Sequence, residues 1–257
     1  GQVDLAPGGE WILPTTSSFT FTEEEEEAEQ AVSATVFADP EKAAADAENR
    51  WHGLLARGLA DVPEDPELQK IAVKCIMTLI GNWRSAAGDL KRDGITPSIS
   101  ASYFASGLWA WDTWKQAVAV ARFHPEPAEE SIRSMFHFQV APDDPHRPQD
   151  DGMILDCVFQ KADENNDRNS KPPLAAWAVW EVYKSSRNAD FLAEMFPRLL
   201  KYHRWWYSVR DHDGNGIAEY GATVHPAHVD HGAVIEAAAW ESGMDNAPRF
   251  DGDYGID

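Results

Sequence analysis

The segment Pro172-Pro-Leu-Ala-Ala-Trp-Ala-Val-Trp180 gives the strongest indication of the fold class of this chain. Proline suits the first position of a helix, because the N–H that it lacks would have no partner there in any case. The residues that follow are apolar on every side, and a helix without a polar face is normally buried all round. We therefore expect residues 172–186 to form an inner helix that other helices cover.

Helical patterns continue on both sides of this segment. Asp65 can cap a helix that Pro66 opens. An apolar stripe follows at Leu68, Ile71, Cys75, Ile76, Leu79 and Ile80. Further helical patterns begin near residue 44, after Asp112, at Pro127, at Asp190 and at residue 233. About seven helices with no convincing strand between them predict an all-α domain.

The first forty residues have a different character. Trp11-Ile12-Leu13 and Ser18-Phe19-Thr20-Phe21-Thr22 have strand-like compositions. The acidic run Glu23–Glu27 is typical of a solvated face or of the frayed start of a helix. We interpret residues 1–40 as a tail or linker from a β-rich element and begin the main domain at residue 41.

The chain is strongly acidic. Its 257 residues include 22 Lys and Arg against 43 Asp and Glu, which gives a formal net charge of −21. Such a surface repels nucleic acid and anionic membranes, and no apolar run reaches the length of a membrane span. Cys75 and Cys157 are expected to be buried free thiols, since Cys75 falls on an apolar helical stripe.

An aromatic and acidic motif lies at Gly107-Leu-Trp-Ala-Trp-Asp-Thr-Trp-Lys-Gln116. Sugars are bound by stacking their C–H faces on indole rings, while a carboxylate accepts hydrogen bonds from two hydroxyl groups. Trp109, Trp111 and Asp112 are therefore candidates for a sugar-binding wall, with Lys115 beside them. The alternative is that the Trp residues belong to the core and that Asp112 only caps a helix.

Polar residues also concentrate just before the apolar helix. Arg147-Pro-Gln-Asp-Asp-Gly152 and Asn169-Ser-Lys-Pro-Pro173 lie in a long interruption, and long loops of this kind are often functional. In a helical barrel such loops form one rim of the central cavity, which makes Gln149, Asp150 and Lys171 candidates for binding. The alternative is a turn-rich surface loop.

A third motif alternates oxygen-bearing side chains. In Asp211-His-Asp-Gly-Asn-Gly-Ile-Ala-Glu219, side chains fall at positions 1, 3, 5 and 9 of an EF-hand-like loop, and a carbonyl falls at position 7. The sequence predicts a structural Ca²⁺ site from Asp211, Asp213, Asn215, Ile217 (through its carbonyl) and Glu219, although Ala222 replaces the usual Glu at position 12. An ordinary turn is the alternative. His225, His228 and His231 follow, and we favour loop histidines over a zinc site there.

These motifs together resemble glycoside hydrolase family 63, the group of processing α-glucosidase I, and its bacterial branch most of all. The resemblance runs from about Trp51 to Asp245. It is carried by Gly81-Asn-Trp-Arg84, the 107–116 motif, Arg147-Pro-Gln-Asp150, Arg168-Asn-Ser-Lys-Pro172, the 210–221 segment and Trp240-Glu-Ser-Gly-Met-Asp245. Each motif alone is weak, but the occurrence of all six in the same order as in the family makes the resemblance specific.

The resemblance implies an (α/α)6 barrel of twelve helices, of which residues 41–257 would supply the N-terminal half. It implies that Asp245 is the general acid, that Asp112 binds the non-reducing sugar, and that the 211–219 loop binds calcium. Trp240 and Glu241 would also line the substrate pocket. The family's general base has no candidate here, and we expect it in the remaining half of the barrel, supplied by a further segment or by a second chain.

The function expected from this resemblance is exo-hydrolysis of α-linked glucosyl oligosaccharides with inversion, outside the cytoplasm. An inverting enzyme needs two carboxyl groups roughly 6.5–9.5 Å apart, so that water fits between the base and the sugar. One alternative is a carbohydrate-binding protein without catalysis. Another is a mannosyl- or glucosylglycerate hydrolase, which needs positive charge near the substrate's carboxylate, and Arg147 and Lys171 are the candidates for it.

Overall fold

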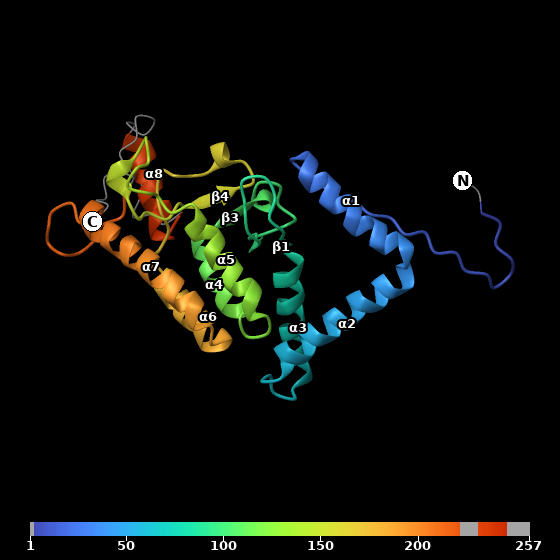
Figure 1. Cartoon of the computed structure of the whole chain (residues 1–257). Helices are drawn as coiled ribbons and strands as arrows, with labels where there is room; N and C mark the ends of the chain where they lie inside the picture. The colour runs from blue at the N-terminus through green and yellow to red at the C-terminus, as the bar shows by residue number, and fades with distance from the viewer. Residues whose placement is uncertain (1–2, 222–230, 246–257) are drawn as a thin grey trace. The chain divides into compact units, whose positions relative to one another are not determined.

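The computed structural model describes residues 3–221 and 231–245, and the side chains of residues 231–233 are outside that description. The chain divides into two compact units, Gly1–Gly53 and Leu54–Asp257 (Figure 1). In the first unit, helix α1 (Glu23–Ala38) begins after Thr22, whose side chain accepts a hydrogen bond from the Glu25 N–H. Four glutamates occupy its first turn, where negative charge is favoured by the helix dipole.

The N-terminal residues do not form strands. Residues 3–20 are irregular, and their apolar side chains are largely exposed, with Trp11 at 54% and Phe19 at 79%. The strand-like composition expected there is therefore not expressed as a sheet. A strand needs a partner to satisfy its backbone groups, and the described part of this unit offers none. The acidic run, by contrast, does begin a helix.

The rest of the described chain is predominantly helical, which confirms the all-α class. Asp65 caps α3 as predicted, since its carboxylate accepts from the N–H groups of Glu67 and Leu68. The helices are α2 (Pro40–Leu59), α3 (Pro66–Gly81), α4 (Ala110–Val120), α5 (Pro125–His137), α6 (Ala175–Ser186), α7 (Ala189–Val209) and α8 (His231–Ser242), with short 3-10 turns at Phe104–Ser106, Pro148–Asp150 and Ala162–Glu164.

Two short antiparallel ribbons interrupt the helices, where the sequence predicted no strands. Strand β1 (Trp83–Arg84) pairs with β2 (Gly94–Ile95), and β3 (Gly107–Trp109) pairs with β4 (Cys157–Phe159). Runs of two or three residues carry too little alternation to be recognised from sequence. The second ribbon matters for the site, because β3 leads directly into α4 and the residue before β4 is Asp156.

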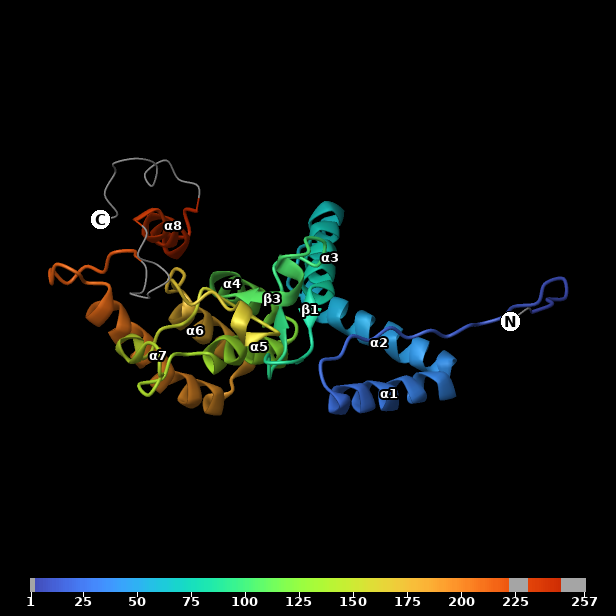
Figure 2. The same ribbon diagram turned by 90° about the horizontal axis from the view of Figure 1, so that it is seen from above.

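The core of the larger unit lies among α4, α5, α6 and α7, which Figure 2 shows grouped together. Fully buried side chains from these helices interlock there, and burying each large one contributes about 1.5–3 kcal/mol. They include Trp114, Ile132, Met135, Phe136, Val182 and Phe191. This packing fixes the N-terminal end of α4 and the loop that enters α6.

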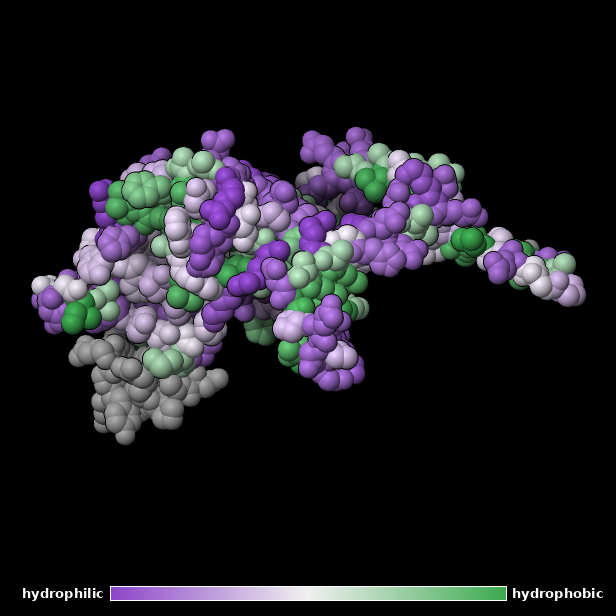
Figure 3. All heavy atoms as spheres, turned by 90° about the horizontal axis from the view of Figure 1, so that it is seen from below, coloured by the Kyte–Doolittle hydropathy of each residue, from purple (hydrophilic) through white to green (hydrophobic). Residues whose placement is uncertain are grey.

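Helices α6 and α3 keep large apolar side chains exposed. Helix α6 was expected to be buried all round, but Trp177 is 43% exposed and Trp180 is 52% exposed. The stripe on α3 is likewise uncovered at Leu68, Ile71 and Cys75, so the expected burial of Cys75 is wrong. Hydrophobic surface is visible among polar atoms in Figure 3. Both cysteines are free thiols, as predicted, and Cys157 is buried.

None of the helices in the described residues combines the length and the hydropathy that a bilayer span requires.

Candidate functional site

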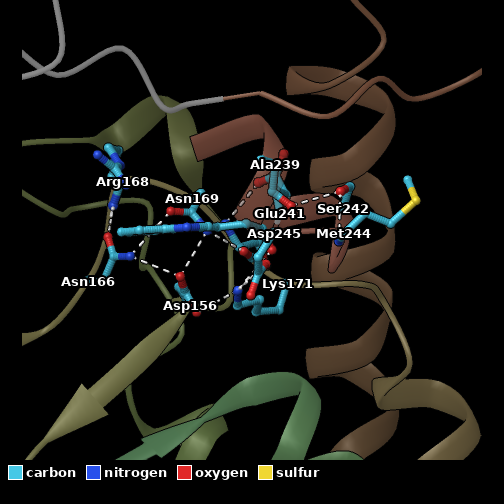
Figure 4. A network of polar contacts seen from close by, with 12 residues as sticks. Asp156, Asn166, Arg168, Asn169, Lys171, Ala239, Glu241, Ser242, Met244 and Asp245 are labelled. Atoms are coloured by element: carbon cyan, nitrogen blue, oxygen red, sulfur yellow. Dashed lines mark hydrogen bonds and ion pairs between the residues drawn. The ribbon is translucent and has the colours of Figure 1, made fainter. Parts of the chain in front are cut away.

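Lys171 lies at the centre of the candidate site. Its ammonium group is buried and donates a hydrogen bond to the carbonyl of Trp240 at 2.9 Å. The same Nζ lies 3.6 Å from Oδ1 of Asp156 and 3.6 Å from Oδ1 of Asp245. In Figure 4 Lys171 lies beside Asp156 and next to Asp245. One cation thus joins the residue before β4 to the segment that ends α8.

The backbone of Lys171 is also fixed. The Tyr202 hydroxyl on α7 donates to the Lys171 carbonyl at 3.1 Å, and it contacts the hydroxyl of Ser170 at 2.8 Å. Pro172 and Pro173 follow, so this segment enters α6 with restricted backbone freedom. The backbone of Lys171 is therefore held by α7 and by the two prolines, and its ammonium group is held by Trp240, Asp156 and Asp245.

Trp111 provides an aromatic surface beside these charges. Nζ of Lys171 lies 5.3 Å from the centre of its ring, and Nζ of the exposed Lys115 lies 4.4 Å from it. Gly243, at φ +72°, follows α8, and a Cβ there would lie 3.0 Å from the indole and 2.9 Å from Pro172. Glycine is thus required for the end of α8 to reach Trp111.

Trp109 supports this surface from beneath. It is buried against Cys157 and Phe159 of β4, and Trp111 packs on that cluster. The rings of Phe104 and Phe159 lie 4.9 and 5.4 Å from its own. Both indoles were predicted to form the sugar-binding wall. Trp111 is partly exposed and can contact a ligand, whereas Trp109 is buried and packs against Trp111.

Asp112 lies in the first turn of α4 and is half-buried. Burial raises the pKa of its carboxyl group above the ordinary value, the charges of Lys115 and Lys171 act against that rise, and the charge of Asp245 adds to it. The three predicted site residues Asp112, Lys171 and Asp245 are therefore electrostatically coupled. Asp245 itself is partly open, with 39% of its side chain exposed.

Asp156 is a site residue that the sequence analysis missed. It is buried, and its Oδ2 accepts hydrogen bonds from the side-chain amides of Asn166 at 2.9 Å and Asn169 at 3.0 Å. Burial raises the pKa of Asp156 to about 6, although the neighbouring Lys171 opposes the rise. A signal was present: Asp156 is the one charged residue in the apolar run from Met153 to Phe159, and a buried charge there needs a partner.

Glu241 does not line the pocket, contrary to expectation. It is fully buried, and it forms a two-point ion pair with Arg210, whose Nε and Nη2 donate at 2.7 and 2.9 Å. The backbone N–H groups of Ser170 and Gly221 donate to the same carboxylate, both at 2.8 Å. Both carboxylate oxygens of Glu241 already accept hydrogen bonds inside the protein, so they are not available to a substrate. These bonds connect α8 to the loops that contain Ser170 and Gly221.

Three other polar candidates also have internal partners. Asp150 is buried and accepts a hydrogen bond from the Trp205 indole N–H at 3.0 Å, and the exposed Gln149 donates to it at 3.4 Å. Arg147 is buried in an ion pair with Asp167. The expectation that Arg147 meets a substrate carboxylate is therefore not supported by its position.

Trp240 is half-buried, and the guanidinium of Arg168 lies 4.5 Å from the centre of its ring. Arg168 also pairs with Glu236 one turn earlier on α8. The carbonyl of Trp240, and not its indole, is what reaches Lys171. Trp240 thus contributes to the site through its backbone.

The predicted calcium loop gathers its carboxylates. One oxygen each from Asp211, Asp213 and Glu219 lies within 4.8 Å of the others. Oδ1 of Asp211 is buried without a hydrogen-bond donor, which suits a metal ligand. The side-chain oxygen of Asn215 accepts from the N–H of Ile217 at 2.8 Å. His225 and His228, named above for the zinc alternative, lie outside the described residues.

Comparison with known proteins identifies relatives. Residues 105–256 match the family model described as the mannosylglycerate hydrolase MGH1-like glycoside hydrolase domain. The chain is 29% identical over 163 residues to mannosylglycerate hydrolase MGH2 of Selaginella moellendorffii, which covers 56% of this chain and 28% of that protein. It is 28% identical over 207 residues to the mannosylglycerate hydrolase of Rubrobacter radiotolerans, covering 74% of this chain and 41% of that one.

Glucosylglycerate hydrolase of Mycolicibacterium hassiacum is 25% identical over 226 residues, which covers 75% of this chain and 43% of that protein. A crystal structure of an uncharacterized conserved protein from Thermus thermophilus matches 69% of this chain and 38% of its own, with 25% identity and a TM-score of 0.45. The chain spans less than half the length of these curated relatives.

Proposed function

This chain belongs to the family of mannosylglycerate hydrolase MGH1-like glycoside hydrolase domains, and from that premise we propose that it forms part of an enzyme that hydrolyses α-mannosyl- or α-glucosylglycerate. The α-glucosidase acting on neutral oligosaccharides, favoured from the sequence, is less well supported than this alternative. Relatives named as mannosylglycerate and glucosylglycerate hydrolases favour the glycerate substrates.

The observation that carries the proposal is the convergence of Asp112, Asp156 and Asp245 beside Trp111 and around one buried ammonium group. An indole face stacks on a sugar ring, and a half-buried carboxylate such as Asp112 accepts hydrogen bonds from sugar hydroxyls. Lys115 supplies an exposed positive charge beside the same indole, where a substrate carboxylate would be attracted. Lys115 therefore takes the role that Arg147 was expected to play.

Within this proposal Asp245 is the proton donor. Its carboxyl group is the open one, since 39% of its side chain is exposed whereas Asp156 is buried. The proton of Asp245 passes to the glycosidic oxygen as the bond from that oxygen to the anomeric carbon breaks. Water attacks the opposite face of the sugar and loses its proton to a carboxylate base roughly 6.5–9.5 Å away. We assign that base to the part of the barrel that this chain does not supply.

The uncovered apolar faces of α3 and α6 support a missing neighbour. Soluble monomers rarely expose contiguous apolar patches beyond about 300–600 Å². Trp177 and Trp180 on α6, with Leu68 and Ile71 on α3, present the kind of surface that further barrel helices would cover. We propose that a further segment or a second chain packs on these helices and completes the barrel.

Turnover by the assembled enzyme tests the proposed function. α-Mannosylglycerate and α-glucosylglycerate are compared with the neutral disaccharides nigerose and kojibiose, and the released hexose and its anomer are followed by NMR. We expect at least about a 10-fold higher kcat/KM for a glycerate substrate, because one charge-assisted contact contributes about 1.5–3 kcal/mol. Residues 1–257 alone should be inactive. A preference for the neutral disaccharides would refute the proposal.

The calcium prediction has a separate thermal test. Asp211, Asp213, Glu219 and the carbonyl of Ile217 offer the hard oxygen ligands that Ca²⁺ prefers, and the ion would hold the 211–219 loop in place. Calcium at about 100 times its Kd should raise the melting temperature by about 5 °C or more. The Asp213→Asn variant should lose most of this shift, and Asp163→Asn, in an exposed turn, should keep it. An equal shift in both variants would exclude this site.

A further inference from the structure

Lys171 is an unusual residue for its depth. Its ammonium group is almost fully buried, and a buried charge persists only when negative groups and hydrogen-bond acceptors surround it. One hydrogen-bond acceptor and two counter-charges are present: the Trp240 carbonyl accepts at 2.9 Å, and one carboxylate oxygen each from Asp156 and Asp245 lies at an ion-pair distance of 3.6 Å. The ammonium group of Lys171 thus lies between two carboxylates, where its charge acts on both.

The contacts of Lys171 hold the segment that carries the proton donor. The Trp240 carbonyl and the Asp245 carboxylate belong to the same short segment at the end of α8, and Lys171 contacts both. Asp156 fixes Lys171 from the other side, and it is itself anchored by the amides of Asn166 and Asn169 (Figure 4). The chain of contacts therefore runs from β4 through the ammonium group to Asp245.

The charges around this group are few and well defined. Two further ion pairs near α8, Arg210 with Glu241 and Arg168 with Glu236, are each internally neutral. The remaining titratable or charged groups that face the site in the described residues are Tyr103, Asp112, Lys115, Asp156, Cys157, Lys171 and Asp245. Three carboxyl groups thus share one buried ammonium and one exposed ammonium.

We propose that Lys171 and Asp156 are positioning residues for Asp245: Lys171 holds its carboxyl group in place, and the opposed charges of the pair set the pH range in which Asp245 donates a proton. This inference rests on the proposed function, in which Asp245 is the general acid. A positive charge beside Asp245 favours its ionised form, and the negative charge of Asp156 favours its protonated form. The two effects oppose each other at one carboxyl group.

The coupling is visible from the other partner. Burial raises the pKa of Asp156 to about 6, and the charge of Asp245 adds to the rise. Nζ of Lys171 lies 3.6 Å from a carboxylate oxygen of each residue, so a change of charge at Asp156 acts on the ammonium group that holds Asp245. Asp156 is therefore more than a structural partner of Lys171.

Two substitutions should shift activity in opposite directions along the pH axis. In the assembled enzyme, Asp156→Asn removes the negative charge that offsets Lys171. The fall of kcat/KM on the alkaline side of its pH profile (the alkaline limb) should then occur at a pH lower by about one unit. Lys171→Met removes the cation, so the limb should move up by about one pH unit. The double variant D156N/K171M removes both charges, and its limb should return close to that of the wild type.

A purely structural role makes a different prediction. Loss of packing would lower kcat at every pH and leave the limb where it is. Lys171→Arg keeps the charge and should keep the wild-type limb even if kcat falls. Lys184→Met removes an exposed ammonium from α6, where it pairs with Glu181 at 2.6 Å, and should move nothing. Thermal unfolding of each variant confirms that it is folded.

A second measurement does not depend on the substrate. Carboxyl carbons of ¹³C-labelled aspartates can be titrated by NMR, with the Asp245 signal assigned by its loss in Asp245→Asn. Opposite displacements of that titration in D156N and K171M would support the proposal, and displacements that are absent or of equal sign would overturn it. If the wild-type enzyme hydrolysed no glycosylglycerate, the proposed function would fail, yet this titration would still decide whether the charge pair acts on Asp245.

Discussion

Substitution of Asp245 by asparagine is expected to reduce hydrolysis of glycosylglycerate about 1,000-fold in the assembled enzyme. General acid catalysis contributes about 10²- to 10⁴-fold, and an amide of the same shape cannot supply the proton. Asparagine keeps the side-chain volume, and its oxygen can still face Lys171, so the fold and the position of the segment should be preserved. The loss should therefore fall on kcat, with little change in substrate affinity.

The measurement is kcat from hexose release together with the Kd of a glycosylglycerate by calorimetry. Asp163→Asn, which makes the same chemical change in an exposed turn, serves as the matched control and should retain full activity. An asparagine variant that turns over at more than about a tenth of the wild-type rate would remove Asp245 from the role of proton donor. Loss of binding together with turnover would instead make it a substrate ligand.

Substitution of Glu241 by alanine is expected to destabilise the fold by about 3–5 kcal/mol. The side chain is fully buried, and its carboxylate accepts four hydrogen bonds from Arg210, Ser170 and Gly221. Removing it leaves the guanidinium of Arg210, which is 1% exposed, without a counter-charge. For a chain of this size the melting temperature should fall by about 10 °C.

Thermal unfolding followed by circular dichroism provides the measurement. Glu236→Ala removes a carboxylate on the same helix whose side chain is 51% exposed, and as the control it should cost clearly less, about 1 kcal/mol. The double substitution Arg210→Met with Glu241→Leu should recover much of the loss, because neither charge is then buried alone. A melting temperature unchanged by Glu241→Ala would mean that this ion pair does not hold α8 in place.

The position of Glu241 also changes how its motif is understood. The sequence placed Glu241 and Asp245 together in one candidate site, since they stand four residues apart. In the structure Glu241 faces Arg210 inside the protein and Asp245 faces Lys171 at the partly open side. Gly243, with its positive φ, turns the chain between them. One residue therefore anchors the segment and the other presents a reactive group.

The helices were predictable because their signals are local. Asp65 and Pro66 mark the start of α3, and apolar residues at helical spacing mark the faces of α3 and α7. The junction at Asp112 was likewise found, since an acidic residue follows closely on Trp109 and Trp111. Convergence of Asp112, Lys171 and Asp245 was expected from the resemblance of ordered motifs to a known family, and not from spacing.

The extent of burial was not predictable from local patterns. An apolar helix such as α6 is normally buried on all sides. Trp180 is nevertheless 52% exposed, because the described helices pack against only one side of α6. The strand prediction near Trp11 was wrong for a related reason, because a strand forms only when a second strand elsewhere in the chain pairs with it. Both errors concern which other parts of the chain pack against a segment, and the composition of that segment does not specify this.

Local sequence signals gave the helical class and the start of α3 at Pro66, whereas α5, expected from Pro127, begins at Pro125. The resemblance of ordered motifs to a known family named Asp112, Lys171 and Asp245. Only the tertiary structure decided which charges meet: Arg210 pairs with Glu241 across 31 positions, and Lys171 reaches the Trp240 carbonyl across 69. Such pairs leave no periodic trace, because the energy of a buried charge depends on what surrounds it in space and not on its neighbours in the chain. Asp156 stands out in the sequence only as the one charge in an apolar run, and folding is what brings it within 3.6 Å of Lys171.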